Sequence, residues 1–333
     1  MRQVRLGAKG PEVSVLGLGC MGMSGMYGPA DRGESIATLH AALEAGVTLL
    51  DTGDFYGMGH NEMLIGEALR GVARERYQLS VKFGALRDPG GAWYGYDSRP
   101  AAVKTFLSYS LQRLGVEYLD IYRPARLDSA VPIEDTIGAI ADMVRAGYVR
   151  YVGLSEVGSE IVRRAAAVHP ICDLQIEYSL LSRGIEDGIL ATCRALGVGI
   201  SAYGVLSRGL LSGHWKEQAA GGGDWRGHAP RFAGENLERN LALVEALRRV
   251  AGAKAVSVAQ LAIAWVLTRG QDIVPVIGAR RREQLREALG ALEVTLSAGE
   301  LAAIEAAVPK GAAAGERYAP ALMKFLDSER GTT

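Results

Sequence analysis

The sequence has few of the features that would indicate a secreted, metal-stabilised or nucleic-acid-binding protein. Its 333 residues include three cysteines, Cys20, Cys172 and Cys193, an odd number without the spacing of metal ligands. We therefore expect these thiols to be small buried hydrophobic groups, and we expect no metal site. The 37 basic residues equal the 37 acidic residues in number, so no overall positive field attracts nucleic acid.

Long apolar runs are missing as well. No stretch approaches the roughly 18 consecutive apolar residues that a membrane-spanning helix requires. Residues 1–10 also lack the apolar stretch of a signal peptide. We therefore expect a cytoplasmic protein that binds neither membrane nor nucleic acid. The sequence makes no prediction of its oligomeric state.

Short apolar segments recur eight times along the chain and predict parallel strands. They are continuous apolar runs rather than alternations of apolar and polar residues, which is typical of strands covered on both faces. These segments cover residues 13–19, 47–51, 77–84, 118–123, 149–155, 172–178, 197–203 and 272–278.

Amphipathic segments separate most of these strands and predict helices. They cover residues 34–46, 61–72, 99–115, 132–147, 159–169 and 184–197. Several end in glycine, such as Gly46 and Gly115, which suits a left-handed C-cap before a strand. Eight strands that alternate with helices predict an α/β fold, a (β/α)8 TIM barrel, in a single domain over residues 1–333.

Three segments depart from the plain repeat. Residues 1–15 predict a β-hairpin that could plug the floor of the barrel. The glycine-rich residues 204–235 form a long insertion after the seventh strand, and loops of that length are usually functional or disordered. Residues 311–333 are mostly small and polar, and we expect this tail to lie on the surface.

Polar residues at the ends of two adjacent strands indicate a site, because active sites of such barrels lie at the C-terminal strand ends. Asp51 ends the second strand, Lys82 ends the third, and Tyr56 follows Asp51 in a loop. A neighbouring ammonium would lower the phenol pKa from its ordinary value of about 10, and the carboxylate would balance the ammonium. Tyr56 could then protonate a carbonyl oxygen. In the alternative, Asp51 and Lys82 form a structural pair and Tyr56 only packs.

Six segments in register resemble the aldo-keto reductase family. DTGDFYGMGHNEMLIGEAL resembles its signature around the catalytic Asp and Tyr, and SVKFG resembles its lysine segment. Four more are similar to the longer bacterial and potassium-channel-β-like branch: GYVRYVGLSEV, DLQIEYSLLSR, AYGVLSRGLLSG and PRFAGENLERN. The resemblance implies that Tyr56 is the general acid, supported by Lys82 and Asp51. It also implies NADP(H) as the cofactor that reduces a small-molecule carbonyl substrate.

The largest departure from the family pattern lies in YRPARLD, where the family usually has YxLHRxD and where Ala125 takes the place of the histidine. That histidine helps to orient the carbonyl, so its loss predicts slower turnover or a larger pocket. Channel-β-like and pyridoxal-reductase-like members also lack it. Arg123 points to the same side of the strand. It could donate to the substrate oxygen or brace Asp51, or it could turn to a neighbouring acid of the barrel.

The resemblance implies an extended cofactor across the barrel mouth, and no GxGxxG motif indicates a Rossmann site. The expected contacts near the nicotinamide are Ser155, Glu156, Gln175 and Tyr203. By family position the contacts also include Cys20, Met21 and Asp51. The pyrophosphate would lie under Gly204, Val205, Leu206, Ser207, Arg208 and Gly209. Arg226 would anchor the loop that covers it. Glu156 stands where many relatives have asparagine, and a carboxylate cannot donate to the amide oxygen.

A basic run at the last strand-to-helix junction predicts a phosphate site. Arg280, Arg281 and Arg282 lie at a helix N-terminus of an otherwise neutral protein. The arginine fork can bind two oxygens of a phosphomonoester, which favours NADP over NAD. The resemblance implies contacts from Gly278, Arg280, Gln284 and Glu287. In the alternative, the run is a solvated helix start.

The aromatic loop 85–98 could form a wall of the substrate pocket. The candidates for that pocket are Trp93, Tyr94, Arg123 and Ala125. Two other functions stay open. One is an NADP(H)-binding sensor or regulatory subunit with slow turnover, and the other is an aldolase-like barrel in which Lys82 forms a Schiff base.

Overall fold

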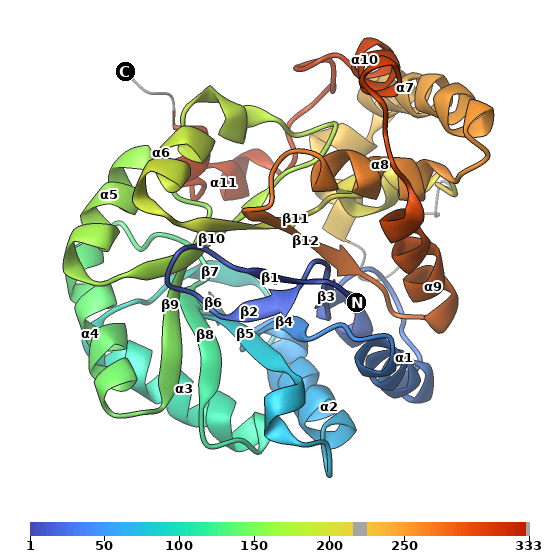
Figure 1. The fold of residues 1–333 in the computed structure, drawn as a ribbon. Coiled ribbons are helices and arrows are strands. Elements are labelled where there is room, and N and C mark those ends of the chain that lie inside the picture. Colours follow the sequence, from blue (N-terminus) through green and yellow to red (C-terminus); the bar gives the residue numbers. More distant parts are fainter. Residues whose placement is uncertain (216–224, 331–333) are drawn as a thin grey trace.

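The computed structural model describes residues 1–215 and 225–330, and a closed barrel of eight parallel strands lies at its centre (Figure 1). The strands follow one another around the barrel as β3 (Gly17–Gly19), β4 (Leu49–Gly53), β5 (Gln78–Phe83), β8 (Leu119–Pro124), β9 (Val149–Ser155), β10 (Ile171–Glu177), β11 (Gly199–Tyr203) and β12 (Ile273–Gly278). Pairing of Val276 with Gly17 closes the ring between β12 and β3. The predicted (β/α)8 barrel is confirmed.

Helices surround the barrel (Figure 1). They are α1 (Arg32–Glu44), α2 (His60–Ala68), α3 (Pro100–Leu114), α4 (Ile133–Arg145), α5 (Ser159–Val168), α6 (Ile189–Leu196), α7 (Gly234–Ala253), α8 (Val258–Leu267), α9 (Arg282–Gly290), α10 (Ala298–Ala307) and α11 (Pro320–Met323). The predicted helix 184–197 is divided into a 3-10 turn over Gly184–Asp187 and α6. The division lies at Gly188, whose φ of 142° does not continue a helix.

The core explains the apolar sequence pattern. Every residue of β4, β8 and β10 is buried, because these strands have the barrel interior on one face and helices on the other. The helix α8 is apolar around most of its circumference and is also buried. No single helix within residues 1–215 and 225–330 is long and apolar enough to cross a membrane. By length and composition α7 and α8 qualify only as a pair, which is bent by 86°.

The predicted N-terminal hairpin is present and lies across one end of the barrel (Figure 1). It consists of β1 (Gln3–Arg5) and β2 (Glu12–Ser14), so the predicted strand 13–19 is divided between β2 and β3. Leu6 and Val13 of this hairpin are fully buried against residues of the barrel floor. Gly7 lies so close to the barrel that a Cβ atom would come within 2.1 Å of the Cys172 carbonyl oxygen, which leaves room for no larger residue.

Two segments at the end of the barrel opposite the N-terminal hairpin differ from the prediction. The loop 85–98 contains a second hairpin, formed by β6 (Ala85–Arg87) and β7 (Trp93–Tyr96). Residues 311–330, expected as a surface tail, are mostly exposed or half-buried, but two of them lie in the protein interior. Arg317 is only 4% exposed and Leu326 only 2%. A charged side chain can be buried there because carboxylates from the barrel pair with it.

Candidate active site

Asp51 and Lys82 form an ion pair in the barrel interior, at the C-terminal ends of β4 and β5. The Lys82 Nζ donates to the Asp51 Oδ1 over 2.5 Å, and both side chains are almost fully buried. Ser80 and Gln175 donate to the other carboxylate oxygen over 2.8 and 2.6 Å. Burial lowers the pKa of Lys82, and the adjacent Asp51 opposes that shift. The carboxylate is thus held by three donors and balances the ammonium.

Tyr56 begins a 3-10 turn directly after β4 and is buried beside this pair. The Lys82 Nζ lies 5.1 Å from the centre of the Tyr56 ring, and Phe55 packs edge-on against the ring at 4.8 Å. Burial, and after it the charge of Asp51, raises the pKa of the Tyr56 hydroxyl well above its usual value. Burial thus outweighs the lowering of this pKa expected from the Lys82 ammonium, which Asp51 holds at contact distance.

The end of β8 carries Ala125 at the position where the family has histidine. Ala125 is buried, and its N–H donates to the Phe83 carbonyl oxygen over 2.8 Å. Arg123 is fully buried in the barrel interior, where it pairs with Asp173 at 2.9 Å. It therefore does not line a substrate pocket, and the alternative of a neighbouring barrel acid is correct. Its link to Asp51 is indirect, since it donates to the Ser80 hydroxyl over 3.0 Å.

Glu156, directly after β9, holds the C-terminal segment, which we define as residues 315–329. Arg317 donates to its two carboxylate oxygens over 2.9 and 2.5 Å. The hydroxyls of Tyr203 and Ser328 each donate over 2.6 Å, and the Glu177 N–H donates over 3.0 Å. These five hydrogen bonds leave the Glu156 carboxylate with no free acceptor position. The acceptors of Glu156 are therefore engaged by the C-terminal segment, by Tyr203 and by the backbone at the end of β10.

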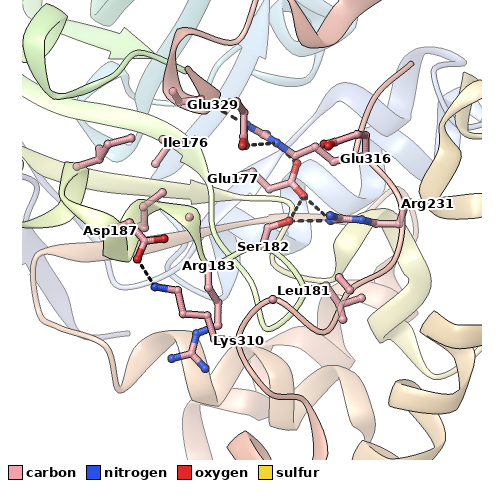
Figure 2. A pocket seen from close by; sticks show the side chains of 17 residues that line it. Ile176, Glu177, Leu181, Ser182, Arg183, Asp187, Arg231, Lys310, Glu316 and Glu329 are labelled. Carbon is pink, nitrogen blue, oxygen red and sulfur yellow. Dashed lines mark hydrogen bonds and ion pairs between the residues drawn. The ribbon is translucent and has the colours of Figure 1, made fainter. Parts of the chain in front are cut away.

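Glu177 at the end of β10 is the second buried carboxylate of this cluster. Arg317 donates to it over 3.0 Å, Arg208 over 2.5 Å, and Arg231 lies 3.8 Å away. Figure 2 shows Glu177, Ser182 and Arg231 converging on a cavity of about 230 Å³ between residues 176–189 and the C-terminal part of the chain. Arg317 thus joins the ends of β9 and β10 by pairing with both carboxylates.

A larger groove of about 490 Å³ runs over the ends of β11, β12 and β3. Its lining includes ten of the residues predicted to bind cofactor: Gly204, Val205, Leu206, Arg208, Gly209, Arg226, Gly278, Arg280, Gln284 and Glu287. Tyr27 and Trp215 also line it and were missed, since each lies in a loop without a recognisable motif. Segments more than sixty residues apart in sequence therefore form one elongated groove.

The other predicted cofactor residues lie at the barrel mouth or beneath it. Ser155 and Ser207 are buried, and Gln175 is engaged by Asp51. Cys20 is fully buried, and its N–H donates to the Asp51 carbonyl oxygen over 2.9 Å, while Met21 begins the 3-10 turn that follows. These residues are not among those that line the groove.

Arg226 spans the groove. It donates to the Arg208 carbonyl oxygen over 2.8 Å, and its guanidinium lies 5.1 Å from the Tyr27 ring centre and 5.0 Å from that of Trp215. This placement suits the predicted anchor of a covering loop. Residues 216–224, which belong to the predicted loop 204–235, lie outside the described residues.

The three consecutive arginines Arg280, Arg281 and Arg282 contact different parts of the protein. Arg280 and Arg281 line the groove at the N-terminus of α9, where backbone N–H groups favour anions. Arg280 also donates to the carbonyl oxygens of residues 27–29, on the opposite side of the groove. Arg282 forms an ion pair with Glu34 at 2.9 Å and so ties α9 to α1 instead.

The aromatic hairpin places one of its two candidates near the catalytic pair. Trp93 packs edge-on against Phe55, with ring centres 5.3 Å apart, and Phe55 contacts Tyr56. Tyr94 is 66% exposed, so the structure does not bring it to the site. Tyr318 of the C-terminal segment lies at the mouth, where its hydroxyl is 3.1 Å from that of Tyr203. Sequence analysis missed this residue because its segment has no apolar periodicity.

Comparisons with known proteins agree with this architecture. Residues 15–309 match the model of the Aldo/keto reductase family. The protein "Probable aldo-keto reductase 1" of Glycine max is 41% identical over 327 residues, which are 98% of this chain and 94% of that protein.

Solved structures of similar shape include two bacterial enzymes. Glycerol dehydrogenase AKR11B4 of Gluconobacter oxydans has a TM-score of 0.83 and 27% identity, covering 99% of this chain and 98% of its own. The holo form of aldo-keto reductase AKR11C1 of Bacillus halodurans has a TM-score of 0.77 and 27% identity, with coverages of 95% and 98%. The match over most of its length shows that this chain belongs to the aldo-keto reductase family, whose members are oxidoreductases that act on carbonyl compounds.

Proposed function

We propose that this protein reduces an aldehyde or ketone to an alcohol with NADPH, and that Tyr56 supplies the proton. The observation that carries the proposal is the position of the Asp51–Lys82 pair beside Tyr56, at the same end of the barrel as the groove. A nicotinamide bound at the inner end of that groove would supply hydride to the carbonyl carbon. The groove has the elongated shape and the basic outer end that a dinucleotide phosphate requires.

The chain's own residues account for the proton. Burial keeps Tyr56 protonated at neutral pH, so the hydroxyl holds its proton until the carbonyl oxygen gains negative charge. The proton then passes from the Tyr56 oxygen to the nascent alkoxide, and a phenolate remains. The Lys82 ammonium, 5.1 Å from the ring centre, stabilises that phenolate, and Asp51 keeps the lysine charged in its buried position.

Arg280 and Arg281 support the choice of NADPH over NADH. Both line the outer end of the groove at the start of α9, whereas Arg282 is engaged by Glu34. Two guanidinium groups at a helix N-terminus suit a phosphate monoester. We expect Arg281→Met to raise the KM for NADPH about tenfold and to leave the KM for NADH nearly unchanged.

A second candidate function is an NADP(H)-binding sensor with slow turnover, and Ala125 is the observation that favours it. The methyl group of Ala125 cannot orient a carbonyl as an imidazole does. In this function NADPH binds tightly but every carbonyl compound is reduced slowly. We also propose that the protein works in the cytoplasm, on small molecules rather than on nucleic acid.

The test follows NADPH absorbance with a panel of aldehydes, quinones and pyridoxal, while tryptophan fluorescence reports cofactor binding. We expect Tyr56→Phe to bind NADPH normally and to lose at least a hundredfold in kcat, the usual contribution of a positioned general acid. A Tyr56→Phe enzyme that turns over at the wild-type rate would refute the proposal. Tight NADPH binding without reduction of any compound would favour the sensor.

A further inference from the structure

Arg126 is a cation on the substrate side of the barrel mouth. It follows Ala125 at the end of β8, beside the position where the family has histidine. In the ring of eight strands β8 stands four positions from β12, so it lies opposite the strand that leads to Arg280 and Arg281. The phosphate end of the groove and Arg126 therefore belong to opposite sides of the mouth.

Among the described residues, Arg126 is half-buried and has no carboxylate in contact, unlike the buried arginines of this region. Arg123 pairs with Asp173, and Arg208 and Arg317 pair with the carboxylates of the β9 and β10 ends. Within residues 1–215 and 225–330, no carboxylate oxygen lies within 4.0 Å of the Arg126 guanidinium. It donates to neutral groups instead: the Ala125 carbonyl oxygen at 2.6 Å, the Tyr318 hydroxyl at 3.3 Å and the Ser155 hydroxyl at 3.5 Å.

Arg126 is charged, and among the described residues no carboxylate in contact with it neutralises that charge. Burial opposes the charge, but a guanidinium stays protonated in proteins. Glu156 favours the charge from beyond contact distance, and its own acceptors are committed to Arg317 and other donors. A half-buried cation that no carboxylate contacts favours an anionic ligand.

The position of Arg126 relative to Tyr56 suits a substrate that spans the two. Arg126 donates to the hydroxyls of Ser155 and Tyr318, at the same end of the barrel as Tyr56 and Lys82. Ala125, next to it, presents only a methyl group, and Trp93 packs against Phe55, which contacts Tyr56. A planar molecule with a carbonyl at one end and a negative charge at the other would match this arrangement.

We propose that Arg126 binds a carboxylate of the substrate, and that the physiological substrate is a carbonyl compound carrying a carboxylate. The inference rests on the proposed reduction at Tyr56 and specifies its substrate class. Arg126 then takes over the orienting role that the family assigns to the histidine. The guanidinium fork accepts a carboxylate in a fixed orientation, which holds the carbonyl toward the Tyr56 hydroxyl.

The test compares two compounds that differ only in charge, 4-formylbenzoate and its methyl ester, with full-length protein and NADPH. We expect wild-type protein to have a kcat/KM for the acid about 10- to 100-fold above that for the ester, the range that a charge-assisted hydrogen bond supports. Arg126→Met should abolish this preference through a higher KM for the acid. Its kcat/KM for the ester should change little, and Arg126→Lys should restore part of the preference.

Two controls separate binding from folding and from net charge. Arg239→Met removes the same charge from the exposed face of α7 and should leave the preference intact. Competitive inhibition by benzoate should be lost in Arg126→Met, while NADPH affinity stays at the wild-type value. Equal turnover of acid and ester by wild-type protein, or a preference that survives Arg126→Met, overturns the inference and leaves the proposed function standing. If neither compound is reduced while other carbonyl compounds of the panel are, the inference alone fails; if no carbonyl compound is reduced, the proposed function fails as well.

Discussion

Removal of the Arg317 guanidinium is the sharpest test of how the C-terminal segment is held. In Arg317→Met the packing volume is nearly kept, but Glu156 loses the cation that contacts both of its oxygens. Glu177 loses one cation and keeps Arg208 and Arg231. The variant therefore leaves mainly Glu156 without a counter-charge, and breaking one buried ion pair typically destabilises a protein by about 3–5 kcal/mol. We expect a loss in the free energy of unfolding of that size.

The pH dependence distinguishes this cause from a loss of packing. Burial alone would raise the pKa of Glu156, but Arg317 outweighs burial and holds it below its usual value. In wild-type protein this pair therefore stabilises the fold above a pH of about 4.3 and loses its effect only as the pH falls further. In Arg317→Met burial prevails and raises the pKa of Glu156. The variant should then lose stability as the pH rises, so its deficit should grow between about pH 4 and about pH 7.

The assay is urea denaturation followed by tryptophan fluorescence at several pH values, with Glu156→Gln and the double variant alongside. Neutral glutamine removes the unpaired charge, so the double variant should lose less than the sum of the two single variants. A coupling energy of about 1 kcal/mol or more is expected for residues in direct contact. Additive losses, or a deficit that does not change with pH, would refute the reasoning.

Three further predictions concern the fold and the catalytic pair. Burial raises the pKa of Asp54 to about 8, so wild-type protein should lose stability as the pH rises from about 4 to about 8, and Asp54→Asn should remove that loss in urea titrations. In Gly66→Ala a Cβ atom would lie 2.7 Å from a carbonyl oxygen of α3, so we expect a melting temperature below wild type. Gly138→Ala has open space and should gain about 0.5–1 kcal/mol. Asp51→Asn leaves Lys82 without a counter-charge, and kcat should fall about 10²- to 10⁴-fold in steady-state assays.

The barrel and the buried Asp51–Lys82 pair could be predicted because buried parallel strands leave a strong signal. Strands such as β4 and β10 are covered on both faces, so their sequences are continuous apolar runs. An ionisable residue at the end of such a run, as at Asp51 and Lys82, is conspicuous because burial of a charge requires a partner. The order of the strands then places both residues on adjacent strands.

The contribution of the C-terminal segment could not be predicted from local pattern. Residues 311–330 are small and polar and lack helical or strand periodicity, which is the composition of a solvent-exposed tail. Their placement depends on Arg317 and Tyr318, whose partners lie more than a hundred residues earlier in the chain. Arg126 was missed for a related reason, since an arginine that follows a strand is usually solvated.

One departure from the family pattern does indicate that a cation from elsewhere in the chain is needed at this site. Glu156 replaces a neutral residue at a buried strand end, and a carboxylate there must be matched by a cation from elsewhere in the chain. The requirement names the type of partner but gives neither its position nor its distance in sequence. The structure supplies it as Arg317, and this pairing brings Tyr318 against Tyr203 and Arg126.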